Sequence, residues 1–301
     1  MSERDIRLPD GAQTGAAMSA SQAARRMWTL FEPIHAVTYF AAEARAAFEA
    51  AGVRGFWRGY FAGRSAPLGQ VTAAPVTASF YTFAPQMVSR ALPGVWELIT
   101  PDQALATREA GAVAALNRLL GDLTDAAGRA ADMLAEAAER LDCSGRVLAA
   151  ANAALSVPAD PVARLWHAAT VLREHRGDGH FAALLASDVD GCESNVLRAG
   201  FDLPRETIQP LRGWTDEQWT GAAARLAARR LIGSDGTPTP AGAELHAAIE
   251  ATTDVAAARP WADQRFAADL AEMLYPIALA CSAEVPVPNP VGAPVPDGRD
   301  R

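Results

Sequence analysis

The 301-residue sequence contains no lysine, so all 27 of its basic residues are arginines. Its three cysteines, Cys143, Cys192 and Cys281, are far apart and match no Cys-x-x-Cys spacing, which favours buried free thiols in a reducing compartment over disulfides. No apolar run reaches the ~18 residues that a membrane-spanning helix requires. Residues 1–20 are polar and lack the apolar block of a signal peptide. We therefore expect a flexible N-terminal tail on a cytoplasmic protein that has no membrane partner.

Positive charge is also scarce relative to negative charge. The formal net charge is −8 and the isoelectric point is about 5.2. Nucleic acid presents dense negative charge, and proteins that bind it usually carry a basic surface. The composition therefore argues against DNA as the main partner. Half of the residues are hydrophobic, and the length allows two ordinary domains with a full core.

Long alanine-rich segments with apolar residues at helical spacing predict a mostly α protein. The stretch 156–161, Ser-Val-Pro-Ala-Asp-Pro, breaks the helical pattern, and we place a domain boundary there. This gives a first half over 21–157 and a second half over 158–283. Residues 284–301 are rich in proline and are expected to run extended along the surface.

The two halves repeat one plan, in which a helix and a short hairpin precede a Thr-Pro pair that opens a long helix. Thr100-Pro101 opens that helix in the first half, and Thr239-Pro240 opens it in the second. The hairpins are predicted around the extended piece 95–99 and around the turn 233–236. We infer an internal duplication.

The stretch 214–245 resembles the recognition helix, wing and following helix of MarR-like winged-helix proteins. In that family the helix ends in a basic residue and a leucine, here Arg230-Leu231, and the wing turns on Asp-Gly, here Asp235-Gly236. A Thr-x-x-Gly motif begins the next helix, here Thr239 to Gly242. The resemblance implies two diverged winged-helix-like halves with short β-hairpins.

The whole chain resembles a little-characterised family of actinobacterial proteins classed with helix-turn-helix folds. The segments that carry this resemblance are Glu-Pro-x-His at 32–35, Phe-Trp-Arg-Gly-Tyr-Phe at 56–61 and His-Arg-Gly-Asp-Gly-His at 175–180. It implies a fold and no established activity.

The recognition-helix segment itself is poorly suited to DNA. Its first turn contains Asp216 and Glu217, which would meet the phosphates, and the wing 233–237 carries no cation. The corresponding segment of the first half, 77–89, is almost wholly apolar or aromatic and is expected to be buried. A MarR-like DNA-binding regulator is therefore the alternative function, and DNA is an unlikely partner.

Chemistry-bearing residues concentrate between positions 164 and 185, where three of the five histidines lie. Gly177 and Gly179 predict a tight turn between two helices, around which His175, Asp178 and His180 converge. The structural alternative is a glycine turn capped by Asp178, with both histidines hydrogen-bonded to the backbone.

Glu32 and His35 lie one helical turn apart, a spacing that suits an acid/base dyad or half of a metal site. His167 occupies the equivalent place in the second half. The alternative for both histidines is a packed core residue with one hydrogen bond. No HExxH motif or similarly specific spacing is present, so metal and cofactor stay unknown.

An aromatic and arginine-rich segment forms a second concentration. Arg58 and Arg64 could clamp a carboxylate or phosphate, with Trp57 stacking beside them, or could belong to a solvated face.

We therefore predict that the halves enclose a pocket for a small organic, anionic molecule. The acid/base candidates are His175, Asp178, His180, His35 and Glu32. The ligand-binding candidates are Trp57, Arg58, Arg64, His167 and Arg176. Binding alone and acid/base catalysis use the same residues, so the choice between them stays open, as does a homodimer.

Overall fold

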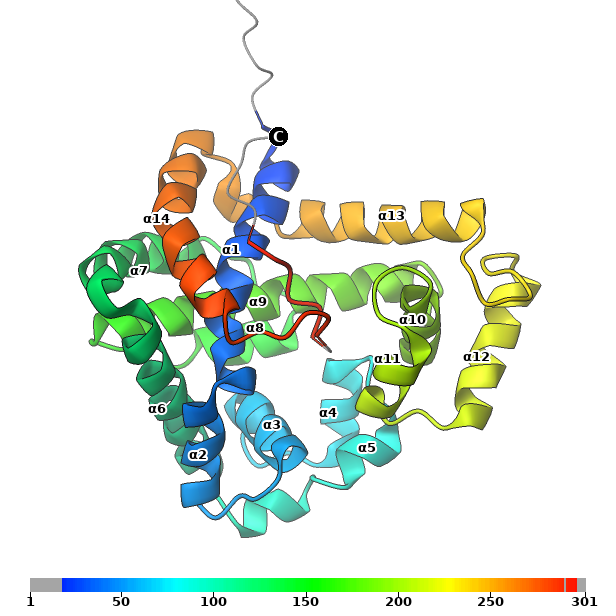
Figure 1. Ribbon diagram of the computed structural model, residues 1–301, viewed down its shortest axis with the longest axis horizontal. Coiled ribbons are helices and arrows are strands. Elements are labelled where there is room, and N and C mark those ends of the chain that lie inside the picture. Colours follow the sequence, from blue (N-terminus) through cyan, green and yellow to red (C-terminus); the bar gives the residue numbers. More distant parts are fainter. Residues whose placement is uncertain (1–17, 290, 297–301) are drawn as a thin grey trace, which may run out of the picture.

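The computed structural model describes residues 18–289 and 291–296, and the described chain is mostly helical (Figure 1). The α-helices in chain order are α1 (Ala20–Phe40), α2 (Ala42–Ala50), α3 (Phe56–Ser65), α4 (Ala73–Phe80), α5 (Pro85–Ser89), α6 (Pro101–Leu120), α7 (Thr124–Glu139), α8 (Val147–Ala153), α9 (Pro161–Ala186), α10 (Gly191–Ala199), α11 (Arg205–Arg212), α12 (Asp216–Ala228), α13 (Pro240–Ala256) and α14 (Gln264–Ser282). Short 3₁₀ helices are η1 (Ala66–Leu68), η2 (Gly94–Glu97), η3 (Gly121–Leu123) and η4 (Arg259–Trp261). The predicted mostly α class is confirmed.

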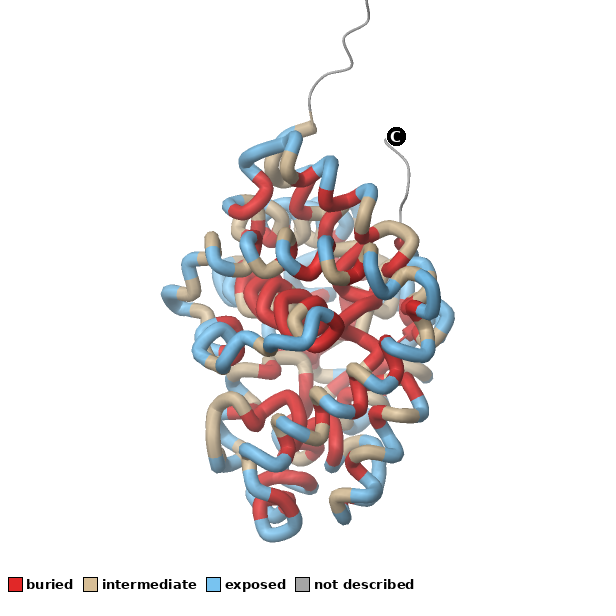
Figure 2. Tube along the Cα trace, turned by 90° about the vertical axis from the view of Figure 1, so that its left-hand side faces the viewer, coloured by how far each residue is buried: buried red, intermediate tan, exposed pale blue. Residues whose placement is uncertain are grey.

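Helix α9 is the central element of the molecule. Asp160 caps its first turn by accepting from the Ala163 backbone N–H at 2.8 Å, and Pro161 occupies the first helical position. Its buried residues lie on all sides, because α1, α6, α7, α8 and α13 all pack against it. Figure 2 shows the buried segments gathered in the middle of the molecule, with exposed residues toward its edges.

The first and last helices of the chain pack against each other and against helices from its middle. Helix α1 packs against α14 and α9, and α7 packs against α9 and α14. One apolar cluster therefore contains Met27, Leu134, Leu165 and Leu274, which come from four different helices. The connector near Pro158 joins α8 to α9 beside this cluster.

The second half contains a helix-turn-helix unit in α10, α11 and α12. Gly213 takes a left-handed conformation (φ 76°) after α11, which lets the chain turn within three residues. Thr215 then caps α12 through a capping box with Gln218. Thr239 caps α13 in the same half, as the sequence predicts.

The predicted β-hairpins are wrong. Within residues 18–289 and 291–296 there is no strand, only an isolated bridge between Ile232 and Pro238. The turn between them closes by Gly236 N–H donating to Gly233 O at 3.1 Å. Because α12 ends at Ala228 and α13 begins at Pro240, too few residues flank this turn for a ladder. The segment 94–97 of the first half is a 3₁₀ helix because its backbone bonds to itself three residues apart.

The predicted turn at Gly177 and Gly179 is also wrong, because α9 continues through both residues. Neither glycine has a positive φ. A helical glycine costs only about 1 kcal/mol relative to alanine, which packing along a long buried helix readily overrides. Gly179 instead lets the Arg146 guanidinium lie against the helix backbone, since a Cβ there would be 2.4 Å from Arg146 Nη1.

The helix-turn-helix unit of the second half is in direct contact with the first half. Figure 1 shows α4 and α5 beside α10 and α11. The Ala84 N–H donates to Arg212 O at 2.9 Å, and the Asn195 side chain donates to Thr82 O at 2.9 Å. Gly191 permits this approach, because a Cβ there would lie 2.0 Å from Tyr81 O. The two halves therefore close on each other through backbone contacts.

The terminal predictions are only partly covered by the structure. Most of the N-terminal tail lies outside the described residues. After α14, residues 284–289 and 291–296 contain no helix or strand, as their proline content predicts. Of the helices that the structure describes, none combines the length and the apolar character needed to span a membrane.

Candidate functional site

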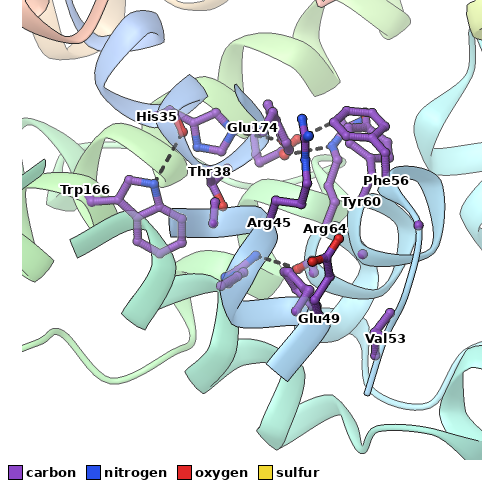
Figure 3. Close-up of a pocket in the computed structure, with 17 residues that line it drawn as sticks. His35, Thr38, Arg45, Glu49, Val53, Phe56, Tyr60, Arg64, Trp166 and Glu174 are labelled. Carbon is purple, nitrogen blue, oxygen red and sulfur yellow. Dashed lines mark hydrogen bonds and ion pairs between the residues drawn. The ribbon is translucent and has the colours of Figure 1, made fainter. Parts of the chain in front are cut away.

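Two hollows of very different size lie next to each other. The larger, which we call the central cavity, has a volume of about 440 Å³ and lies between α1, α9, α10, α13 and the ends of α3 and α11. The smaller pocket, between α1, α2 and α3, has a volume of about 40 Å³ (Figure 3). A water molecule needs roughly 10–15 Å³ by this measure, whereas small-molecule sites span roughly 300–1,000 Å³. Only the central cavity is large enough for an organic ligand.

Arginines outnumber carboxylates in the lining of the central cavity, although Glu174 and Asp254 just behind it pair with four of them. Six arginines face it against three carboxylates. The arginines are Arg25, Arg64, Arg173, Arg176, Arg198 and Arg212. The carboxylates are Glu32, Asp202 and Glu250. A cavity with this lining favours an anion, because guanidinium groups bind carboxylates and phosphates through paired hydrogen bonds.

A buried ion-pair group forms the wall between the two hollows. Arg64 Nε and Nη2 donate to the two carboxylate oxygens of Glu174 at 2.9 Å each, with side chains 5% and 1% exposed. Arg173 donates to Glu174 at 2.9 Å and to Glu32 at 3.3 Å. Burial acts to raise the pKa of Glu174, but the Arg173 and Arg64 guanidinium groups more than offset this and hold it well below its usual range. Figure 3 shows Arg64, Tyr60 and Glu174 meeting at this wall.

A second ion-pair group lies at the other end of the cavity. Arg176 donates to Asp254 at 2.7 Å, and Arg25 donates to the same carboxylate at 2.9 Å. The Trp28 ring lies under both guanidinium groups, with 4.7 Å from its centroid to Arg176 Cζ. These contacts fix Arg176 so that it is presented to the cavity in one orientation.

Helix α9 supplies the floor of the cavity. Arg173, Arg176, Gly177 and His180 fall on one helical face, at the three- and four-residue spacing that brings side chains together. Gly177 leaves the middle of this face open, because a Cβ there would meet only a Glu174 oxygen at 4.0 Å. The floor therefore presents two guanidinium groups and an imidazole around Gly177, where no side chain fills the space.

Arg212 closes the cavity on the side of the helix-turn-helix unit. It lies at the end of α11, and its guanidinium stacks over the Phe83 ring at 4.4 Å. Burial lowers its pKa to about 10, which still leaves it charged at neutral pH. The two halves thus each contribute a cation to the lining.

The structure brings four of the ten predicted site residues together at the central cavity. These are Glu32, Arg64, Arg176 and His180. His35 lines the smaller pocket instead, where Nδ1 lies 2.9 Å from Thr170 Oγ1 and Nε2 lies 2.9 Å from the Tyr39 hydroxyl. Burial, together with the charge of Arg173, lowers the pKa of His35 well below its usual value, so it is neutral.

The other five predicted residues line neither hollow. Trp57 packs in an aromatic cluster, and Arg58 is exposed. His167 is buried near Arg108, and burial lowers its pKa to about 4. His175 Nε2 lies 3.1 Å from Asp142 O, and Asp178 accepts from the Ala149 N–H at 2.9 Å. The predicted cluster is not formed, because a continuous helix places His175 and Asp178 on one face and His180 on another.

The metal site considered from sequence is not assembled. Among the residues that the structure describes, no three His, Cys, Asp or Glu side chains are placed to share an ion. In particular, His175 and Asp178 face α7 and α8, whereas Glu32 and His180 face the cavity.

Sequence reasoning missed several residues of the cavity. Arg173 lines the cavity and Glu174 lies behind it, and the available signal was that this charged pair directly follows the apolar segment 165–172. Arg25, Arg198 and Arg212 carry no local signal, because their role depends on which helices meet.

Substitution of Asp178 tests whether this residue, which lies outside the cavity, has a structural role. It caps α8 from the neighbouring helix, so Asp178→Ala should lower the free energy of unfolding by about 1 kcal/mol, as loss of a helix cap does. Urea denaturation measures this loss, and Asp178→Asn, which keeps an acceptor oxygen, should recover most of it. A variant with unchanged stability would show that Asp178 has no capping role.

The chain matches the sequence profile of a helix-turn-helix family over residues 24–288, which is most of its length. With α10, α11 and α12 in place, the protein is a helix-turn-helix protein, and it belongs to this family. Comparisons with curated proteins and with solved structures returned no match.

Proposed function

We propose that the protein binds a small organic anion in the central cavity, on a helix-turn-helix scaffold that serves ligand binding. The observation that carries this proposal is the cavity itself. It measures about 440 Å³, lies between the two halves, and presents an excess of arginine in a chain that is acidic overall. Clefts between domains are favoured ligand sites. Apolar side chains such as Trp28, Phe181 and Leu184 complete the lining and would cover the uncharged part of the molecule.

The proposal includes an internal duplication into two halves that follow the helix order of a winged-helix protein, without a β-wing in the residues that the structure describes. Helix α1, the short helices α2 to α5, the long helix α6 and then α7 follow one another in the first half. Helix α9, the short helices α10 to α12, the long helix α13 and then α14 do so in the second. The reciprocal packing of α1 on α14 and of α7 on α9 is the arrangement that two related halves joined about a twofold axis would give.

A DNA-binding regulator is the second candidate, and family membership favours it, since the scaffold is of a DNA-binding type. Three features of α12 count against it. Asp216 and Glu217 are exposed at its first turn. Arg225 remains exposed but pairs with Glu193 at 2.7 Å, which offsets its positive charge. Gln218 accepts from Gln86 of the first half at 2.7 Å, so α5 lies where a duplex would have to approach.

The two candidates differ in their expected affinity for DNA. A regulator should bind its own promoter region at sub-micromolar concentration at physiological salt and lose affinity on Arg229→Ala and Arg230→Ala. We expect no such retardation, because the carboxylates at the α12 N-terminus would face phosphate. A mobility-shift titration measures this, and specific binding that depends on those two arginines would establish the regulator.

Native mass spectrometry of protein purified from its own host tests ligand binding. We expect a retained small molecule, and Arg198→Gln should raise its Kd roughly tenfold, as for loss of one charged hydrogen bond. Arg198 lines the cavity, and its ion-pair partner among the described residues is the exposed Asp202, so the fold should tolerate this change. Arg58→Gln is the matched control, because Arg58 is exposed outside the cavity. Equal effects of both variants would contradict the proposed site.

A further inference from the structure

His180 and His35 are held by the same hydrogen-bond motif on different helices. Nδ1 of His35 lies 2.9 Å from Thr170 Oγ1, and Nδ1 of His180 lies 3.0 Å from Thr253 Oγ1. Each threonine hydroxyl donates to the carbonyl four residues earlier in its own helix, at 2.8 Å in both cases. A hydroxyl has a single hydrogen, so each threonine can only accept from the ring. Nδ1 therefore carries the hydrogen in both histidines, and Nε2 carries a lone pair.

The two histidines differ at Nε2. In His35 the lone pair is occupied, because the Tyr39 hydroxyl donates to it at 2.9 Å. In His180 no residue that the structure describes bonds to Nε2. The His180 side chain is enclosed by protein yet remains 32% exposed, as expected of a group that faces a cavity, and it lines the central cavity. The lone pair of His180 is thus open toward the space where a ligand would bind.

The charged groups around His180 support a neutral ring that can accept a proton. Glu250 Oε1 lies 3.6 Å from Nδ1, on the side away from the lone pair. Arg176, Arg198 and His246 are the other titratable groups that face it. Burial lowers the pKa of His180 to about 4, against the opposing effect of Glu250, so the imidazole is neutral at pH 7. Glu250 would stabilise the ring if it took a proton.

We propose that His180 Nε2 is the proton-accepting group of the central cavity, and that the bound anion also carries an O–H or N–H group that donates to it. This inference rests on the proposed function and specifies the ligand. Arg176 lies four residues before His180, so the two side chains are about 5–6 Å apart along one helix face. The ligand is then an organic acid whose hydroxyl or amino group lies several bonds from the acid group. Such contact would also let His180 act as a general base.

Carbethoxylation with diethyl pyrocarbonate tests the open lone pair without knowledge of the ligand. The Nε2 lone pair attacks a carbonyl carbon of the reagent, ethyl carbonate leaves and decomposes to ethanol and carbon dioxide, and the Nδ1 hydrogen is released as a proton. Peptide mass spectrometry resolves each histidine. The protein is first freed of any retained molecule, because a donor bound at Nε2 would slow the reaction. His180 should then react at least about tenfold faster than His35, whose Nε2 is already hydrogen-bonded.

The variant Gly177→Leu decides whether Nε2 opens into the cavity. Residue 177 lies one turn from His180 on the cavity face, and leucine there should slow the His180 reaction to the His35 rate. A slow reaction in the unmodified protein would show that Nε2 is covered. A fast reaction in both proteins would show that it opens to bulk solvent. Either result overturns the inference.

The retained molecule gives a second readout that separates the inference from the proposed function. Measured as a negative ion after exchange into D₂O, it should keep at least one exchangeable hydrogen. A retained anion with none would overturn the inference and leave anion binding intact. Absence of any retained molecule would count against the proposed function instead, while carbethoxylation would still decide the state of His180.

Discussion

Replacing Glu174 by glutamine is expected to destabilise the protein by about 3–5 kcal/mol, the usual cost of breaking a buried ion pair from one side. Glu174 is 1% exposed and accepts from both Arg64 and Arg173. Glutamine keeps the shape and one acceptor oxygen but leaves two buried guanidinium groups without their shared carboxylate. Urea or thermal denaturation measures the loss.

The pH dependence of the free energy of unfolding provides a second test of the role of Glu174. A carboxylate whose pKa is lower in the folded state contributes stability that is fully present above its unfolded pKa, here about 4.5. That contribution is lost as the pH falls below this value toward the folded pKa. The unmodified protein should therefore lose stability as the pH drops below about 4.5, and Glu174→Gln should show a shallower decline.

The matched control for Glu174 is Glu43, which pairs with Arg118 at the surface. Solvent screens that pair, so Glu43→Gln should change stability far less than Glu174→Gln. Similar losses for the two variants would mean that the buried group contributes no more than a surface ion pair.

The second large effect is expected on ligand binding, when a larger side chain on α9 fills part of the central cavity. Gly177→Leu should weaken ligand binding by roughly 10- to 100-fold, which corresponds to the 1–3 kcal/mol that overpacking costs. The new side chain has room in the empty protein, because a Cβ at this position meets only one atom within 4 Å, at 4.0 Å. Folding stability should rise by up to about 1 kcal/mol, since glycine is unfavourable inside a helix. Native mass spectrometry and thermal melting measure the two effects together.

Gly221→Leu is the control for that experiment. Gly221 also lies inside a helix with open space around its Cα, but it is on α12 and outside the cavity. It should gain helix propensity and leave ligand binding unchanged. Equal loss of ligand in both variants would place the binding site elsewhere.

Features that depend on neighbouring residues could be predicted from the sequence. Thr100 and Thr239 open long helices because a threonine side chain and the following proline set the first turn locally. The mostly α class follows from apolar spacing along the alanine-rich segments. The proline content of the C-terminal segment likewise excludes helix there.

Features that depend on tertiary packing could not be predicted from the sequence. Gly177 and Gly179 carry a strong local turn signal, yet burial of α9 on all sides holds them in a helix. The predicted cluster of His175, Asp178 and His180 depended on that turn and is dispersed without it. Arg64 and Glu174 are 110 positions apart, and no spacing rule connects them.

Which of the two histidines has its Nε2 already hydrogen-bonded was also not predicted from the sequence. His35 and His180 are both acid/base candidates from the sequence, and each is held at Nδ1 by a threonine from another helix. Whether Nε2 is occupied depends on Tyr39, which stands one turn after His35 and has no counterpart after His180. The residue most suited to chemistry is identified only by that comparison.

A crystal structure of protein purified from its own host tests the central claim most directly. We predict electron density for a small organic molecule in the central cavity, with an acid group on Arg173 or Arg176 and a donor group against His180 Nε2. Density for water alone in that cavity, or a bound molecule located at the exposed face of α12, would contradict this account.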